Sequence, residues 1–148
     1  MKNYFKQAVF FVIVLMCFTN TQCDDNNNDV VALECDQQVI VDEDYYSNLE
    51  SENFSFILIE VQQGCLSIVL SASGCNGNSW EYKLVDSGNI AESLPEQRYL
   101  KFELINNEAC LAVFNKNVTF NLEPVRVEGS NEIVLNIEGY PDSITYTY

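Results

Sequence analysis

The chain has 148 residues, of which 47 % are apolar, and a formal charge of −15 that arises from 22 acidic and 7 basic side chains. This length predicts one domain with one hydrophobic core. The negative charge argues against a nucleic-acid partner, because nucleic acids are bound largely through Lys and Arg, and the absence of His excludes Ser-His-Asp and Cys-His catalysis within this sequence.

The first predicted element is a short apolar stretch near the start of the chain. Lys2 and Lys6 precede eleven apolar residues, 8–18. As a helix this stretch would span only about 16 Å, about half the thickness of a bilayer core. A basic start followed by so short an apolar run is typical of a signal peptide rather than of a membrane-spanning helix. We therefore expect residues 1–22 to be removed on export.

Cys23 follows this stretch and is itself followed by a run of Asp and Asn, residues 24–29. The arrangement resembles the signal of bacterial lipoproteins, in which a peptidase cuts before a Cys that carries diacylglycerol. It departs from the common pattern at Gln22 and Asn20, where a small and an aliphatic residue are usual. The resemblance implies lipidation of Cys23 and a lasting anchor in a membrane. Plain secretion and an uncleaved anchor are the alternatives.

An acidic and Asn-rich run after the lipidated Cys resembles the outward address of some Gram-negative lipoproteins. We therefore expect a lipid-anchored protein of the outer membrane that is exposed at the cell surface, with a periplasmic or secreted protein as the alternative. Residues 23–33 would form a tether and residues 34–148 a single β domain. Without residues 1–22 the chain has 5 basic and 22 acidic residues, a net charge of −17, which would hold the domain away from anionic lipid.

Beyond the tether, apolar residues recur at every second position, which is the spacing of strands with one buried face. Turn residues, chiefly Gly and Asn, separate these runs. The pattern predicts an all-β fold, an antiparallel immunoglobulin-like β-sandwich of seven or eight strands, with a small up-and-down β-barrel as the alternative. The alternating runs are residues 66–73, 100–104, 118–123 and 132–138.

Three segments depart from this alternation. Residues 54–61 are apolar on both faces, which predicts a central strand. Residues 42–49 are the helical candidate, with Asp42 as its cap. Residues 89–97, which include Pro95, are expected to form an irregular strap over a sheet edge.

Beyond the leader and Cys23, four Cys remain, and in an exported chain they predict two disulfides. If the strands run alternately up and down, Cys35 and Cys65 lie at one end of the sheet and Cys75 and Cys110 at the other. Disulfide-bonded Cα atoms lie within about 7 Å of each other, so Cys35–Cys65 and Cys75–Cys110 are favoured. A Greek-key crossing would remove this argument. No C-x-x-C pair supports a zinc site instead.

Two groups of residues are candidate sites. The carboxylates of Asp42, Glu43 and Asp44 form a weak candidate for binding Ca²⁺. A solvated helix start, stabilised by the helix dipole, explains the same cluster and is preferred, so no metal or other cofactor is expected. The second group could form a binding face for a protein or glycan, although packing in the core is the preferred interpretation. Its members are Trp80, Tyr82, Tyr140, Tyr146 and Tyr148.

The sequence selects no pair of carboxylates for acid-base catalysis among its 22 acidic residues. We therefore expect a non-catalytic cell-envelope lipoprotein whose β domain is a monomeric module for binding protein or glycan. A small secreted enzyme or inhibitor that acts through acidic residues is the alternative.

Overall fold

The computed structural model describes residues 34–148. The predicted leader, Cys23 and most of the tether lie outside the described residues. In chain order the elements are β1 (Gln37–Gln38), β2 (Ile40–Val41), α2 (Glu43–Asn48), β3 (Phe54–Gln62), β4 (Cys65–Gly74), β5 (Glu81–Ala91), β6 (Glu96–Ile105), β7 (Ala112–Asn121), the 3₁₀ helix η1 (Glu123–Val125), β8 (Glu132–Ile137) and β9 (Ile144–Thr147).

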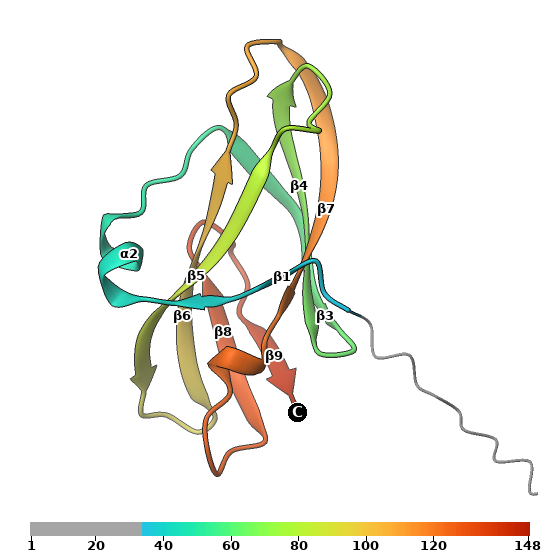
Figure 1. Cartoon of the computed structure of the whole chain (residues 1–148). Helices are drawn as coiled ribbons and strands as arrows, with labels where there is room; N and C mark the ends of the chain where they lie inside the picture. The colour runs from blue at the N-terminus through green and yellow to red at the C-terminus, as the bar shows by residue number, and fades with distance from the viewer. Residues whose placement is uncertain (1–33) are drawn as a thin grey trace, which may run out of the picture. The chain divides into compact units, whose positions relative to one another are not determined.

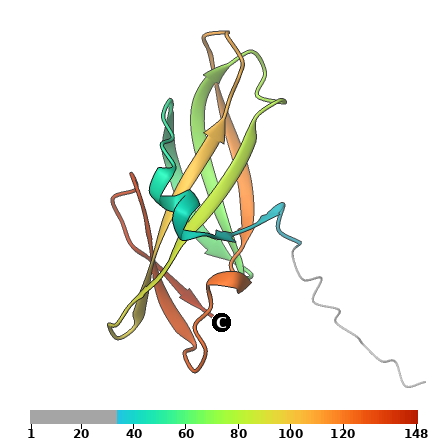
Figure 2. The ribbon, with the colours of Figure 1, turned by 60° about the vertical axis from the view of Figure 1, so that its left-hand side comes forward.

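The strands form two sheets that pack on each other (Figures 1 and 2). One has the order β1-β7-β4-β3 and the other the order β2-β5-β6-β8-β9. This arrangement confirms the predicted all-β sandwich, and neither sheet closes into a barrel within residues 34–148.

The pairing within the sheets is mixed. The pairs β1–β7, β2–β5 and β6–β8 are parallel, whereas β3–β4, β4–β7, β5–β6 and β8–β9 are antiparallel. The chain leaves β6 to form β7 in the other sheet before it returns as β8, so β8 runs in the same direction as β6. Because this crossing joins distant parts of the chain, local alternation could not predict the parallel pairs.

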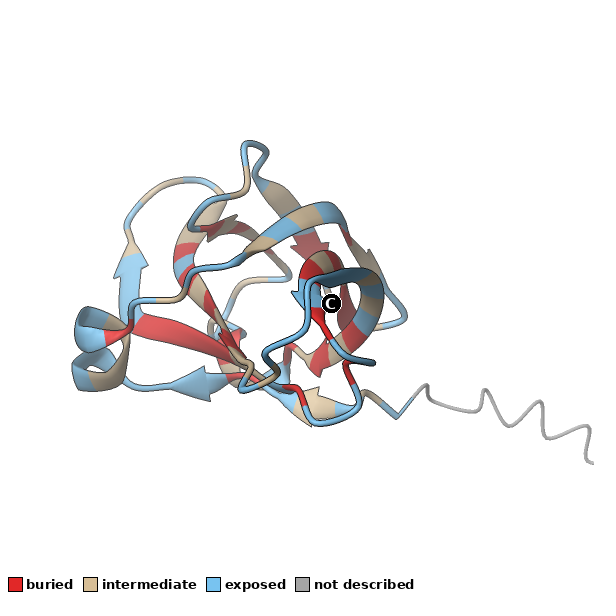
Figure 3. Ribbon diagram, turned by 90° about the horizontal axis from the view of Figure 1, so that it is seen from above, coloured by how far each residue is buried: buried red, intermediate tan, exposed pale blue. Residues whose placement is uncertain are grey.

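The core lies between the sheets, and the predicted alternation is confirmed in the central strands. On β4, for example, Leu66, Ile68 and Leu70 are fully buried. Phe120 on the neighbouring β7 and Leu100 on the facing sheet are buried as well. Figure 3 shows where the buried residues lie along the strands. Burial of each such side chain stabilises the fold by roughly 1.5–3 kcal/mol.

Two disulfides tie the sandwich at opposite ends of β4. Cys35 is bonded to Cys65, with Cα atoms 5.7 Å apart, and Cys75 is bonded to Cys110, with Cα atoms 4.7 Å apart. These are the pairings that strand parity favoured. Because β4 runs from Cys65 to Gly74, the length of one strand separates the two bonds.

The prediction of a central strand at residues 54–61 was wrong. β3 is an edge strand of the four-stranded sheet, with β4 as its one strand partner among residues 34–148. Its second apolar face is partly in solvent, because the side chains of Ile57 and Leu58 are 50 % and 44 % exposed.

The predicted strap over residues 89–97 was wrong as well. These residues belong to the β5–β6 hairpin, in which Ile90 pairs with Arg98 and Ala91 with Gln97. The register shifts between Asp86 and Ile90, which interrupts the period-two pattern, and the Leu94–Pro95 peptide bond in the connection is cis.

Candidate functional site

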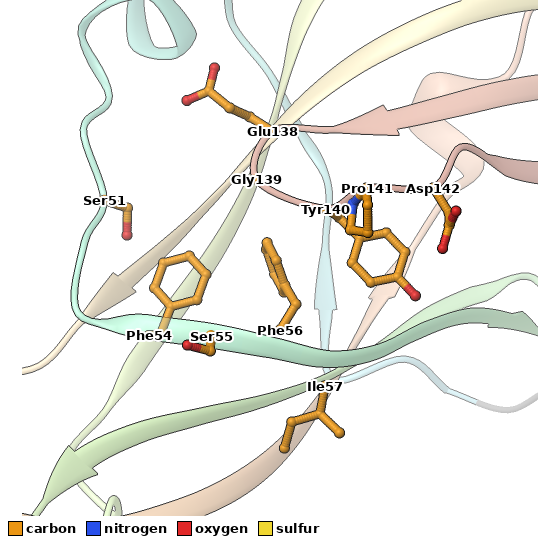
Figure 4. A pocket seen from close by; sticks show the side chains of 10 residues that line it. All are labelled: Ser51, Phe54, Ser55, Phe56, Ile57, Glu138, Gly139, Tyr140, Pro141 and Asp142. Atoms are coloured by element: carbon orange, nitrogen blue, oxygen red, sulfur yellow. The ribbon is translucent and has the colours of Figure 1, made fainter.

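The candidate functional site is a groove between β3 and the turn that joins β8 to β9 (Figure 4). Its volume is about 620 Å³. The groove is lined by Ser51, Phe54, Ser55, Phe56, Ile57, Glu138, Gly139, Tyr140, Pro141 and Asp142.

Aromatic rings form one wall of the groove. Alternation along β3 directs Phe54 and Phe56 to the same side of the strand, with ring centroids 5.0 Å apart (Figure 4). Phe54 also packs edge-on against Phe102 at 5.2 Å, and Phe56 against Tyr140 at 5.9 Å. These edge-to-face contacts link β3 to both the core and the opposite turn, so the wall is well supported.

The opposite wall is a tight turn held by backbone hydrogen bonds. Gly139 has a φ of 82°, a conformation that favours glycine. The N–H of Glu138 donates to the carbonyl of Leu100 at 2.9 Å, and the N–H of Tyr140 donates to the carbonyl of Ile137 at 3.0 Å. The turn is therefore fixed to the five-stranded sheet.

The segments that border the groove are acidic. Residues 50–60 and 138–142 contain five carboxylates and no Lys or Arg. Lys101 offsets part of this charge, because its Nζ lies 3.7 Å from a carboxylate oxygen of Glu138 and donates to the carbonyl of Leu49 at 3.3 Å. An aromatic wall with carboxylates around it suits apolar and cationic groups.

The same charge asymmetry extends over the described domain. Residues 34–148 contain 5 basic and 19 acidic side chains, a net charge of −14, and 13 of the acidic residues are exposed. Every one of the five cations donates to, or forms an ion pair with, an oxygen atom of the same domain, so the surface is dominated by unpaired carboxylates. The five cations are Lys83, Arg98, Lys101, Lys116 and Arg126.

Glu108 organises the loop between β4 and β5. Its carboxylate accepts hydrogen bonds from the backbone N–H groups of Cys75, Asn76 and Gly77 and from the hydroxyl of Ser79. The Gly77 N–H, followed by the other donors, lowers the pKa of Glu108 to about 2. Together with the Cys75–Cys110 disulfide, this carboxylate fixes the tip of the sandwich.

Asp86 on β5 and Arg98 on β6 form a buried ion pair within the five-stranded sheet. Arg98 Nη2 lies 3.2 Å from Asp86 Oδ1, and the two side chains are 5 % and 0 % exposed. Burial raises the pKa of Asp86, while the Gly88 N–H and Arg98 oppose the rise. A carboxyl group with a raised pKa is typical of acid catalysis, but this one has no solvent access to meet a substrate.

Glu108, Asp86 and Arg98 were not among the residues predicted from the sequence. The sequence did contain a signal for the ion pair. Asp86 lies two positions after the inward-facing Leu84, and Arg98 lies two positions before the inward-facing Leu100. Opposite charges at two inward positions of neighbouring strands indicate an internal pair. Glu108 had no comparable signal, since its partners lie on another loop about thirty residues away in the sequence.

The five predicted aromatic residues do not form one face. Trp80 and Tyr146 are core residues, 6 % and 1 % exposed, so the binding-face interpretation was wrong for both. Tyr82 and Tyr148 are half-buried against the core, and Tyr148 accepts a hydrogen bond from the Val127 N–H at 2.9 Å. Tyr140 is the member of this group that lines the groove.

The acidic residues Asp42, Glu43 and Asp44 lie at the start of α2. The Asp42 side chain accepts a hydrogen bond from the Tyr45 N–H at 2.8 Å, which confirms it as the helix cap. Within residues 34–148 no group of three or more His, Cys, Asp or Glu side chains could hold a metal ion.

Cys23 is the remaining predicted site, and it lies outside the described residues. Among residues 34–148, no helix has both the length and the apolar character needed to cross a bilayer.

Comparison with known proteins identifies the fold but no family. No family model and no curated protein matches the chain. A NigD-like immunity protein from Bacteroides caccae is similar with a TM-score of 0.54 and 10 % identity, over 75 % of this chain and 64 % of that one. A DUF1344 protein of unknown function from Bacteroides vulgatus is similar with a TM-score of 0.50 and 15 % identity, over 76 % of this chain and 56 % of that one. The chain thus spans less than two thirds of either structure, and the likeness is one of fold.

Proposed function

We propose that the protein is a non-catalytic module of the bacterial cell envelope that is anchored through lipid on Cys23 and binds a basic protein. The observation that supports binding is the charge distribution. All five cations of residues 34–148 are engaged within the domain, while 13 of the 19 acidic residues are exposed. A surface of one sign attracts a partner of the opposite sign and accelerates encounter with it.

The two disulfides and the leader support the proposed location. Disulfides persist in exported proteins and are rare in the reducing cytosol. A tether with three carboxylates, Asp24, Asp25 and Asp29, would hold the domain off an anionic membrane surface and leave it accessible to a partner.

The two acids with shifted pKa values support a binding role rather than catalysis. The carboxylate with a raised pKa, Asp86, is sealed in the core, and Glu108, with a pKa of about 2, is occupied in fixing a loop. Neither is placed to transfer a proton to a substrate. One of the structures that share the fold is named as an immunity protein. Immunity is a role that a protein-binding module could perform.

The proposal is tested with the native partner. The full chain is crosslinked in intact cells, the bound protein is identified by mass spectrometry, and the purified pair is mixed again in a titration calorimeter at low and high salt. We expect a stoichiometric partner with an isoelectric point above 7 and an affinity that falls as salt shortens the Debye length from about 10 Å at 0.1 M to about 3 Å at 1 M. An acidic partner, or an affinity independent of salt, would contradict the proposal.

A further inference from the structure

β3 is unusual among the edge strands of the two sheets. The other strands at sheet edges are short, with two residues each in β1 and β2 and four in β9. β3 has nine residues and pairs with β4 on one side. On its other side it has no strand partner among residues 34–148, so it presents backbone N–H and C=O groups that another strand could pair with.

β3 also lacks most of the features that prevent such pairing. Natural edge strands are commonly protected by Lys, by Pro or by a covering segment. β3 has the sequence FSFILIEVQ, with neither Lys nor Pro, and exposes the apolar side chains of Ile57 and Leu58. Two protective features are present. A register shift between Phe56 and Leu58 leaves Ile57 without a partner on β4, and the turn at residues 138–142 lies beside part of the strand, with Tyr140 packed against Phe56.

The register shift changes where side chains point rather than covering the edge. In Figure 4, Phe54 and Phe56 point toward the turn at residues 138–142, and Ile57 points to the other side of the strand. The free edge therefore lies beside the groove, with aromatic rings on one side and aliphatic side chains on the other. Bulges of this kind are common next to functional sites, where they re-aim side chains.

We infer that the free edge of β3 binds an extended, basic segment of the partner protein by strand addition, with alternate side chains of that segment entering the groove. The inference rests on the proposed function in taking the partner to be a protein. In strand addition, backbone hydrogen bonds provide affinity, and pockets for alternate side chains, spaced about 6.6 Å apart, provide specificity.

The charge of the site selects the occupant. Residues 50–60 and 138–142 carry Glu50, Glu52, Glu60, Glu138 and Asp142, and no basic residue. Glu138 and Asp142 line the groove, and Lys101 pairs with Glu138 and leaves Asp142 without a cation partner among residues 34–148. A Lys or Arg side chain that enters the groove meets aromatic rings and carboxylates, which stabilise a cation. An acidic segment would be repelled by the same carboxylates.

A second copy of the chain is a poorer occupant for the same reason. If two β3 edges paired, the three glutamates of each segment 50–60 would approach those of the other copy, and each described domain carries a net charge of −14. Like charges brought together at an interface are destabilising. Formation of dimers through β3 is therefore an outcome that would overturn the inference.

The test uses defined peptides and the full chain, purified in detergent micelles with its disulfides intact. The probe is a nine-residue peptide of alternating Lys and Val with blocked ends. One control peptide has Glu in place of Lys, and a second has the Lys-Val sequence with N-methylated alternate amides, which cannot pair with a strand. Binding is measured by fluorescence anisotropy, and hydrogen–deuterium exchange followed by mass spectrometry locates it.

We expect the Lys-Val peptide to slow exchange in residues 54–62 and 138–142 and nowhere else. The N-methylated peptide and the Glu-Val peptide should leave exchange in both segments unchanged. Protection spread over the acidic surface, or equal binding of the N-methylated peptide, would show general electrostatic attraction and overturn strand addition. Dimers that form through β3 without peptide would overturn it as well.

Two matched substitutions test whether the peptide binds at β3. Leu58→Lys adds a charge to the free edge and should weaken binding of the Lys-Val peptide about tenfold, equivalent to 1.4 kcal/mol. Val113→Lys adds the same charge on β7 at a side chain that is 67 % exposed and does not line the groove, and affinity should stay the same. Equal affinity of the two variants would overturn the inference, provided that both unfold at the wild-type temperature.

The native partner separates the two proposals. If the crosslinked partner binds Leu58→Lys as tightly as wild type, strand addition at β3 is wrong while the binding function stands. Loss of partner binding in Leu58→Lys, with normal binding by Val113→Lys, supports both. If no partner is recovered although the Lys-Val peptide protects β3, the binding function fails and the strand-addition site stands.

Discussion

Removal of the Cys75–Cys110 disulfide by a double substitution to Ala should destabilise the domain by about 4 kcal/mol. The bond joins residues separated by 35 positions, and the loss of chain entropy in the unfolded state gives this value at 25 °C. The Cys35–Cys65 bond, with a separation of 30, gives nearly the same value, again about 4 kcal/mol. Domains of this size have unfolding free energies of roughly 5–15 kcal/mol, so loss of both bonds, about 8 kcal/mol, should remove half or more of the stability.

Urea unfolding followed by the fluorescence of Trp80 measures these differences. Trp80 is the single Trp and is 6 % exposed, so its emission shifts to the red when the core opens. The unfolding free energy follows from the midpoint and the slope of each transition. The two double variants should lose similar free energy, and the variant without all four Cys should lose about 8 kcal/mol, or show no cooperative transition if the wild type is less stable than that. A double variant that loses less than about 1 kcal/mol would refute the chain-entropy reasoning for these loops.

Four further substitutions test individual contacts. Because the pKa of Glu108 is lowered to about 2, its stabilisation of the fold is complete above pH 4.5 and is lost as the pH falls toward 2; Glu108→Gln should remove this acid dependence of the urea midpoint, and an unchanged dependence would contradict the assignment. Asp86→Asn leaves the charge of Arg98 buried and unpaired and should cost about 3–5 kcal/mol, whereas replacing both residues by apolar ones should cost less in the same assay. Trp80→Ala should lower the unfolding free energy by about 3–5 kcal/mol, measured by circular dichroism, and full stability would contradict its place in the core. Cys23→Ser should abolish the incorporation of labelled fatty acid into the protein in growing cells, and continued labelling would contradict lipidation of Cys23.

The alternation of apolar residues was sufficient to predict much of the fold. Leu66, Ile68 and Leu70 are separated by polar or half-buried residues, and this local pattern directly reports one buried face. The disulfide pairs could be predicted because β4 lies between Cys65 and Cys75. One full strand length therefore separates these two Cys, and each must pair with a Cys at its own end of the sheet.

Sheet order could not be obtained in the same way. A strand with two apolar faces is expected in the centre of a sheet, but an edge strand that exposes apolar side chains has the same local pattern. β3 is such an edge, with Ile57 and Leu58 exposed. A central strand has a neighbour on each side, whereas β3 has β4 on one side. The neighbours of a strand depend on where the chain crosses between the sheets.

The polar contacts of Glu108 and Asp86 join residues that are distant in the sequence. Glu108 reaches backbone groups about thirty positions away, and Arg98 meets Asp86 across an irregular part of the β5–β6 ladder. The groove is formed by residues 51–57 and 138–142, which only the packing of the two sheets brings together. The aromatic residues were misleading as a group because Trp and Tyr are as common in cores as at binding surfaces.

Intact-mass analysis of the protein isolated from its native cells tests export and anchoring, on which the envelope role depends. We expect a polypeptide that begins at Cys23, carries acyl chains on that residue and has no free thiols at Cys35, Cys65, Cys75 or Cys110. A polypeptide that retains Met1, lacks lipid and has these four thiols free to react would contradict it.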